Sequence, residues 1–194
     1  MIFMKNVMLS ISLVLFFSCH NTSAMSSNNI NEYGRAEQIS DSILHQLQQS
    51  NEVVLAFAVE NYAWVKSINY KIIALNNNQW KGYTYSINKT RGTASINPAE
   101  VSQDSCNAAW KFFQQTTVAK IKGDNGENFC EGEKKNSCNI NDGATWRLLI
   151  LTKNNVIDPA YYEPQFFEEC CPGNKDRKLF LEAVDKINNA INEE

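Results

Sequence analysis

Two apolar runs of strand length limit the folds that are open to this chain. Residues 52–60 read EVVLAFAVE, and residues 144–152 read ATWRLLILT. A strand with one face in water alternates apolar and polar side chains, whereas a strand covered on both faces is apolar almost throughout. Residues 52–60 are therefore predicted to form a central strand of a sheet, and residues 144–152 to form a second buried strand.

A hairpin is predicted between these runs, over residues 68–87. Two strand-like segments flank an Asn-rich turn at residues 76–78, and such turns connect antiparallel neighbours. In the second segment Tyr83 and Tyr85 share one face, while small and polar side chains occupy the other. The tyrosines are therefore expected to pack inward rather than to form, with Trp80, a stacking platform for sugar rings.

Two helices are predicted from apolar spacing and from capping residues. Residues 36–49 place an apolar stripe on one side of a helix, with His45 almost opposite and therefore expected to face water. The stripe consists of Ala36, Ile39, Ile43 and Leu47. Asn97 followed by Pro98 is typical of a helix start, and this second helix is expected to continue to about Lys120.

The last helix is predicted over residues 175–191, after the capping residue Asn174. The order of elements is then helix, strand, hairpin, helix, polar loop, strand and helix. This order favours an α+β fold in which a mostly antiparallel sheet carries helices on one face and loops are stapled by disulfides. We expect one globular domain over residues 35–194, since a chain of this length can bury one ordinary core.

The first 24 residues have the pattern of a signal peptide. Lys5 precedes an apolar run that is too short to cross a bilayer. Ser18-Cys19 after Leu15-Phe16-Phe17 resembles a bacterial lipobox, which favours cleavage before Cys19 and lipidation of that cysteine. Thr22-Ser23-Ala24 instead suits cleavage by ordinary signal peptidase after Ala24. Residues 25–34 are predicted to be a polar tether. We therefore expect an exported protein of the bacterial cell envelope, either periplasmic or held at the membrane by a lipid, with secretion as an alternative.

The charge of the chain argues against nucleic acid as a partner. The formal net charge is −3, and removal of residues 1–24 takes away only Lys5 among the charged groups and leaves −4. Binding to phosphates needs clustered Lys and Arg, whereas the densest basic cluster, Lys134-Lys135, is flanked by Glu131 and Glu133.

The cysteines are expected to form disulfides, since these persist outside the cytoplasm. The candidates are Cys106, Cys130, Cys138, Cys170 and Cys171, and sequence alone does not fix their connectivity. Cys130 and Cys138 are separated by a short polar loop and are predicted to pair. A bridge between the adjacent Cys170 and Cys171 would be strained. A bridge from one of them to Cys106, with the other left free, is an open alternative.

Two other roles for Cys170-Cys171 stay open. A reactive dithiol normally has the spacing Cys-x-x-Cys at a helix start, and here the cysteines are adjacent, although Cys171 shortly precedes a helix. A metal site made of Cys130, Cys138 and this pair is allowed by the number of cysteines, but the spacing matches no closed zinc motif. Residues 123–129, GDNGENF, carry oxygen ligands without the register of a calcium loop. No cofactor or metal is therefore expected.

Catalysis has little support in the sequence. A nucleophile activated by histidine needs that histidine beside it, and His45 is expected to be exposed. A hydrolase that works with carboxylates is the remaining enzymatic alternative. Its candidates lie on one aromatic loop: Asp158, Glu163, Glu168 and Glu169.

We therefore expect a non-enzymatic binding module whose partner is a protein or another macromolecule of the envelope. The candidate surface is the loop of residues 158–171, DPAYYEPQFFEECC. Aromatic side chains beside charges suit an interface, and prolines limit the ordering entropy that binding costs. Tyr161 and Tyr162 are predicted to be exposed contacts, with Asp158 and Glu163 beside them. A thiol-redox or metal-handling protein centred on Cys170-Cys171 is the first alternative.

Overall fold

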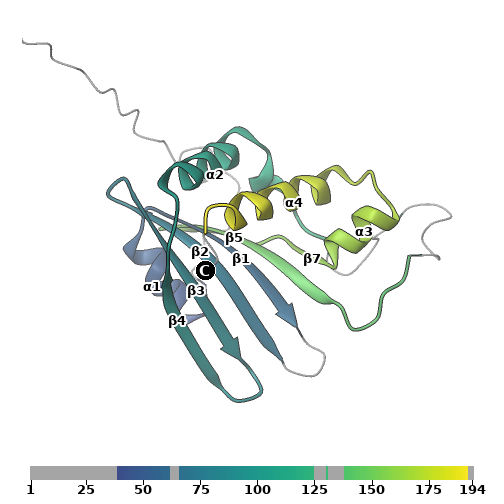
Figure 1. The fold of residues 1–194 in the computed structure, drawn as a ribbon, viewed down its shortest axis with the longest axis horizontal. Helices are drawn as coiled ribbons and strands as arrows, with labels where there is room; N and C mark the ends of the chain where they lie inside the picture. The colour runs from purple at the N-terminus through teal and green to yellow at the C-terminus, as the bar shows by residue number, and fades with distance from the viewer. Residues whose placement is uncertain (1–38, 62–65, 125–129, 131–137, 192–194) are drawn as a thin grey trace, which may run out of the picture.

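The computed structural model describes residues 39–61, 66–124, 130 and 138–191. Within them the chain forms helices and one antiparallel sheet (Figure 1). The strands are β1 (Val53–Asn61), β2 (Ser67–Asn76), β3 (Gln79–Asn88), β4 (Thr93–Ala99), β5 (Ala144–Thr152), β6 (Asn155–Ile157) and β7 (Ala160–Tyr162). The helices are α1 (Ser42–Ser50), α2 (Gln103–Gln115), α3 (Pro164–Cys170) and α4 (Lys175–Asn188), with a 3-10 turn η1 (Val118–Lys120).

The sheet has seven strands in the order β4-β3-β2-β1-β5-β6, and β7 also pairs with β5. Every described pairing is antiparallel. The α+β fold with a mostly antiparallel sheet is therefore as the sequence predicts. Its two disulfides lie in the loop region beside α3.

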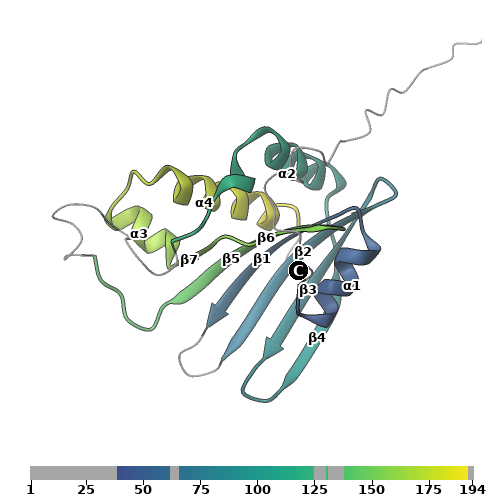
Figure 2. The ribbon, with the colours of Figure 1, turned by 180° about the vertical axis from the view of Figure 1, so that it is seen from behind.

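Helices cover both faces of the sheet, and unequally (Figures 1 and 2). One face packs against α2 and α4, with Leu55 and Leu148 in contact with Trp110 and Phe180 in a single core cluster. The other face carries a second cluster, to which α1 contributes Leu44. Both faces of the middle strands are buried, which agrees with the largely apolar sequences of β1 and β5.

The two strands predicted from apolar runs are confirmed. β1 and β5 are neighbours at the centre of the sheet, paired from Val53 with Thr152 to Asn61 with Ala144. The predicted hairpin is β2 and β3, and its turn places Asn77 and Asn78 at positive φ. Asparagine tolerates this left-handed conformation better than most residues do, which explains the Asn-rich turn.

The first helix is shorter than the apolar stripe indicates. α1 begins at Ser42 because the Asp41 carboxylate caps it, accepting hydrogen bonds from the backbone N–H of Ile43 and Leu44. Residues 36–38 of the predicted helix lie outside the described residues. His45 is half-buried rather than exposed, and its Nδ1 is buried without a hydrogen-bond partner in the described structure.

The prediction that a helix starts at Asn97-Pro98 is wrong. Residues 93–99 form the edge strand β4, in which Pro98 pairs with Tyr83 of β3. An edge strand tolerates proline because the missing N–H can face away from the sheet. The helix starts instead at Gln103, capped by the Ser102 hydroxyl, and it ends at Gln115 rather than near Lys120.

The aromatic segment 158–171 is not an open loop. Its first part is β7, paired with β5, and its second part is α3, which begins at Pro164. The last helix is confirmed, since the Asn174 side chain caps α4 by accepting from the backbone N–H of Arg177.

β6 and β7 follow one register along β5 and are separated only at Asp158-Pro159. Ile157 pairs with Ile150 and Ala160 with Arg147, so Asp158 comes opposite Leu149. The Pro159 carbonyl still accepts from Leu148 N–H at 3.0 Å. Proline has no N–H of its own, so the ladder is interrupted here, beside Arg147.

The signal peptide, Cys19 and the tether of residues 25–34 lie outside the described residues. In the part of the chain that is described, no helix is long and apolar enough to span a membrane.

Candidate functional site

Three charged side chains meet on the α1 face of the sheet, and we call them the Arg147 cluster. Arg147 of β5 donates from Nε to Glu60 Oε1 of β1 at 2.8 Å. It also donates from Nη1 to Asp158 Oδ2 at 3.3 Å. Neither of these two bonds uses Nη2. Since a guanidinium carries five N–H donors, Arg147 retains donors for a further group.

The register of the strands brings these residues together. Arg147 pairs directly with Ala58 on β1 and with Ala160 on β7. Glu60 lies two residues beyond Ala58, and Asp158 lies two residues before Ala160. Both carboxylates are therefore diagonal neighbours of Arg147 on the same face, a separation that long side chains span.

Burial makes the cluster unusual. Glu60 is only 5% exposed, whereas Arg147 and Asp158 are half-buried. Burial lowers the pKa of Arg147, but the hydrogen bond and charge of Glu60, together with the charge of Asp158, outweigh it and leave that pKa above its ordinary value. The guanidinium therefore stays charged, and it compensates a carboxylate that would otherwise be costly to bury.

Two tyrosines extend this row across the sheet. Tyr70 pairs with Ala58, and it stacks on Tyr85 with ring centroids 5.5 Å apart. The Tyr85 hydroxyl donates to Asp41 Oδ2 at 2.8 Å. Burial raises the pKa of both tyrosines well above its ordinary value, and the carboxylates of Glu60 and Asp41 add to this. Neither phenol is therefore available as a base near neutral pH.

Two cavities adjoin the cluster, and both are lined by Arg147 and Asp158. The larger, of about 790 Å³, lies between residues 119–122 and residues 156–160. The smaller, of about 370 Å³, lies between the N-terminal end of α1 and the sheet, with Tyr70 and Glu60 in its wall. Arg147 thus stands at the junction of the two.

The charges of the cavities differ. The larger cavity is lined by three basic residues, Lys120, Lys122 and Arg147, and by one acidic residue, Asp158, and its other lining residues are apolar. The smaller cavity has an excess of acidic over basic groups: Asp41, Glu60 and Asp158 against Lys89 and Arg147. An anionic group with an apolar body therefore suits the larger cavity better than the smaller one.

The four carboxylates predicted for a hydrolase do not form one site. Asp158 pairs with Arg147, while Glu168 accepts from Arg177 Nε at 2.9 Å. Glu163 precedes α3 and accepts from the backbone N–H of Ala144. Glu169 is exposed on α3. Asp158, Glu163 and Glu168 thus bind three separate partners, and the arrangement does not match a pair of acids across a substrate.

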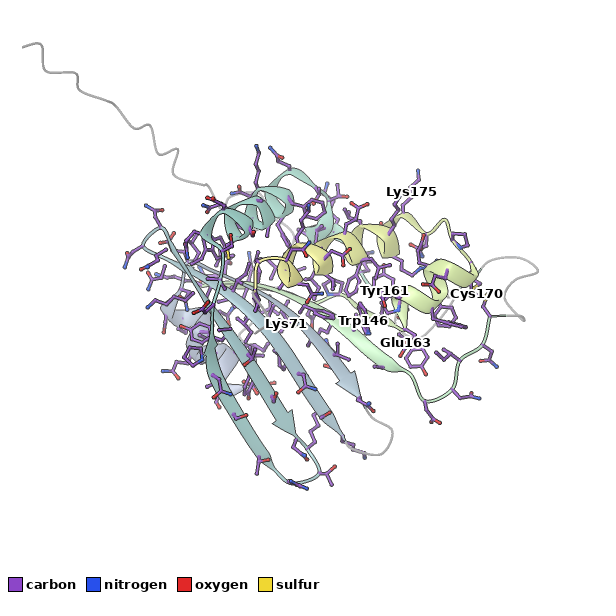
Figure 3. All side chains as sticks on the ribbon, viewed as in Figure 1. Lys71, Trp146, Tyr161, Glu163, Cys170 and Lys175 are labelled. Atoms are coloured by element: carbon purple, nitrogen blue, oxygen red, sulfur yellow. A yellow bond between two sulfur atoms is a disulfide. The ribbon has the colours of Figure 1, made fainter. Side chains whose placement is uncertain are left out.

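The predicted interaction surface at Tyr161 and Tyr162 is also corrected by the structure. Tyr161 is 3% exposed and packs on Phe180 of α4 with centroids 4.9 Å apart. Figure 3 places it where β7 passes α4. Tyr162 is half-buried, and its hydroxyl accepts from the backbone N–H of Gly143 at 2.8 Å. Tyr161 is a core residue because β7 adds it to the face that α4 covers.

The predicted Cys130–Cys138 bridge is not formed. Cys130 pairs with Cys171, and Cys138 pairs with Cys170. The adjacent cysteines therefore anchor two bridges to the segment before β5, and we call these four residues the four-cysteine cluster. Cys106 is unpaired and fully buried in α2, and burial raises the pKa of its thiol to about 11. Cys106 is therefore neither a bridge partner nor a reactive thiolate.

Sequence reasoning missed Glu60 and Arg147. The available signal was a charged residue within an otherwise apolar strand, on the face of its buried neighbours. Arg147 shares a face with Leu149 and Leu151, and Glu60 shares one with Ala58. A charge at such a position needs a partner, but the partner is identified only by the register.

Comparisons with protein-family models, with curated proteins and with solved structures find no match to this chain. Its function is therefore inferred from the sequence and from the described residues.

Proposed function

We propose that the protein is a non-enzymatic binding protein of the cell envelope, and that it holds a small ligand with an anionic group in the larger cavity beside Arg147. The observation that carries this proposal is the position of Arg147, a half-buried guanidinium at the junction of two cavities with donors beyond its two carboxylate bonds. Concave sites with few polar groups on an apolar lining are typical of ligand pockets.

The sequence-based prediction of a macromolecular partner depended on Tyr161 and Tyr162 being exposed. Since Tyr161 is buried, that surface loses its main support, and the cavity replaces it as the binding site. A binding role also agrees with the raised pKa values of Tyr70 and Tyr85, which keep both phenols protonated. It agrees as well with the carboxylate of Glu168, which binds Arg177 as a structural partner.

Thermal unfolding in the presence of small molecules tests the binding role. A panel of carboxylates and phosphate esters, with neutral and cationic analogues of the same size, is added to the purified protein. Ligands that bind only the folded state raise Tm, and saturation at a hundred times Kd stabilises by about 2.7 kcal/mol. We expect the anions to raise Tm and their neutral analogues to have little effect.

Two matched charge reversals locate the site. Lys122→Glu changes a lysine that lines the larger cavity, whereas Lys175→Glu changes an exposed lysine at the start of α4 that lines neither cavity (Figure 3). Lys122→Glu should abolish most of the Tm shift, and Lys175→Glu should retain it. An equal shift in both variants, or no shift with any anion, would contradict the proposal.

Export and lipidation are the second part of the proposal. They are supported by the signal-peptide pattern of residues 1–24 and agree with the two disulfides. Mass spectrometry of the mature N-terminus should find Cys19 with a lipid attached, and Cys19→Ala should release the protein from the membrane fraction. A mature chain that begins unmodified at Met25 would show ordinary cleavage instead.

A further inference from the structure

The two disulfides lie side by side rather than at separate places. The sulfur atoms of Cys130, Cys138 and Cys171 all lie within 4.8 Å of one another. Cys130 and Cys171 belong to one bridge, and Cys138 belongs to the other. The fourth sulfur, that of Cys170, is bonded to Cys138. The two bridges therefore lie next to each other at the end of α3, where Figure 3 labels Cys170.

The end of α3 explains how two adjacent residues contribute to one cluster. Cys170 is the last residue of the helix, and Cys171 follows it with a non-helical backbone at φ −138° and ψ 75°. The bridges bring Cα atoms to 5.6 Å for Cys130–Cys171 and 5.9 Å for Cys138–Cys170. Two separate chain segments are thus held together at the four sulfurs.

The spacing between the bridges is close to that of a zinc site with four thiolates. Zn–S bonds of about 2.3 Å in tetrahedral geometry place neighbouring sulfurs about 3.8 Å apart. The Cys138 sulfur is already within 4.8 Å of both sulfurs of the other bridge, and the Cys170 sulfur is bonded to it. The bonded sulfurs would have to separate by about 2 Å in each pair, since an S–S bond is about 2.05 Å long, and the Cys170 sulfur would have to turn toward those of Cys130 and Cys171.

The surroundings of the four cysteines would close a metal site off from solvent. Cys130, Cys138 and Cys171 are buried, and they pack with Phe167 in a small apolar cluster of their own. Arg177, which is 1% exposed, donates from Nη2 to the Cys171 carbonyl at 2.6 Å. This bond fixes the backbone at Cys171, while the charge of Arg177 is paired with Glu168 at 2.9 Å. Thiolates suit zinc rather than calcium or magnesium.

We propose that the four-cysteine cluster, once reduced, binds one Zn²⁺ ion through Cys130, Cys138, Cys170 and Cys171. A dithiol reductant supplies two electrons and two protons to each disulfide and is itself oxidised to a disulfide. Zn²⁺ then replaces the four thiol protons, which pass to the solvent. The two disulfides and the zinc site use the same sulfurs and therefore exclude each other. Whether it forms two disulfides or binds zinc, the cluster links the segment of Cys130 and Cys138 to the end of α3.

Cobalt titration of the reduced protein tests this inference. The full chain is reduced with excess dithiol, freed of the reductant without oxygen, and titrated with Co²⁺. One equivalent should produce the visible bands of tetrahedral Co²⁺ and the near-ultraviolet sulfur-to-cobalt charge-transfer band, and Zn²⁺ should abolish both. The oxidised protein should give neither band, because its sulfurs are bonded in pairs.

Two serine variants form the matched controls. Cys106→Ser removes a thiol outside the cluster and should leave the spectrum and stoichiometry unchanged, whereas Cys138→Ser should lose the tetrathiolate spectrum. Alkylation of the reduced wild type provides a readout that needs no variant, since one equivalent of Zn²⁺ should protect four thiols. The inference fails if Co²⁺ gives no tetrahedral bands, if Cys138→Ser keeps the wild-type spectrum, or if Zn²⁺ protects no thiol.

Discussion

The sheet and the helix α3 differ in the amount of apolar surface that each buries. The sheet is covered on both faces by clusters that include Leu55, Leu148 and Trp110, all of them fully buried. Beside α3, the separate cluster has four buried residues among those described, of which Phe167 is joined by three half-cystines. The same chain therefore combines one region with ample apolar burial and one with little.

This difference shows what the disulfides stabilise. α3 spans seven residues, which is too short for a helix to be stable on its own. Two bridges and the buried Arg177, which binds Glu168 and the Cys171 carbonyl, hold α3 in place. The sheet needs no cross-link because burial of its two faces outweighs the loss of chain entropy.

The largest expected effect lies within the sheet, at the buried carboxylate of Glu60. Arg147→Met removes the guanidinium that binds Glu60, which is 5% exposed, and removal of one partner of a buried charge pair costs about 3 to 5 kcal/mol. Urea unfolding measures this loss. The double variant Glu60→Leu/Arg147→Met should recover most of it, since it buries no charge there. Equal stability of the single variant and the wild type would show that Glu60 does not need Arg147.

The second effect should be confined to α3. Replacement of Cys138 and Cys170 by serine removes one bridge, for which about 2 to 4 kcal/mol is typical. Hydrogen exchange should then increase at the amides of α3 and remain slow in β1, because the sheet has its own core. A similar loss of protection in both regions would contradict this, since it would show that the bridge contributes to the global stability of the protein.

A third prediction concerns alkaline pH and the sheet alone. Burial raises the pKa values of Tyr70, Tyr85 and Tyr161 above the ordinary 10.0. Above pH 10.0 the unfolded tyrosines lose protons that the folded ones keep, so the free energy of unfolding falls as pH rises. Each tyrosine contributes a slope of at most about 1.4 kcal/mol per pH unit. Tyr85→Phe should make the fall between pH 10 and 12 shallower, and an unchanged slope would contradict this.

The sheet could be predicted from the sequence to a greater extent than the site. β1, β5 and the hairpin follow from patterns within single segments, and the Asn174 cap marks α4. β4 was missed because Asn97-Pro98 fits a helix start as well as an edge strand. Whether this segment forms a helix start or an edge strand is decided by its pairing with β3, which is a long-range contact.

The site depends almost entirely on such long-range contacts. Glu60 and Arg147 are diagonal neighbours only because of the register of β1 on β5. The cysteine pairing depends in the same way on where α3 ends. Proximity in sequence favours Cys130–Cys138, yet both cysteines pair across 41 and 32 residues, with Cys171 and Cys170 respectively. Tyr161 was predicted to be exposed because β7 was not recognised as a strand.

The smallest expected effect lies at the boundary between the sheet and α3. The Tyr162 hydroxyl accepts from Gly143 N–H at 2.8 Å, and Gly143 directly precedes β5. Tyr162→Phe removes this bond, which is worth about 1 kcal/mol and corresponds to about a fivefold change in a local opening equilibrium. The adjacent Tyr161→Phe is the matched control, because Tyr161 lies in the core shared with α4. We expect Tyr162→Phe to speed hydrogen exchange about fivefold at Gly143, Ala144 and α3 while β1 keeps its rates, and Tyr161→Phe to leave α3 unchanged. If Tyr162→Phe instead speeds exchange in β1 by the same factor, α3 and the sheet open together, and the two regions are one cooperative unit.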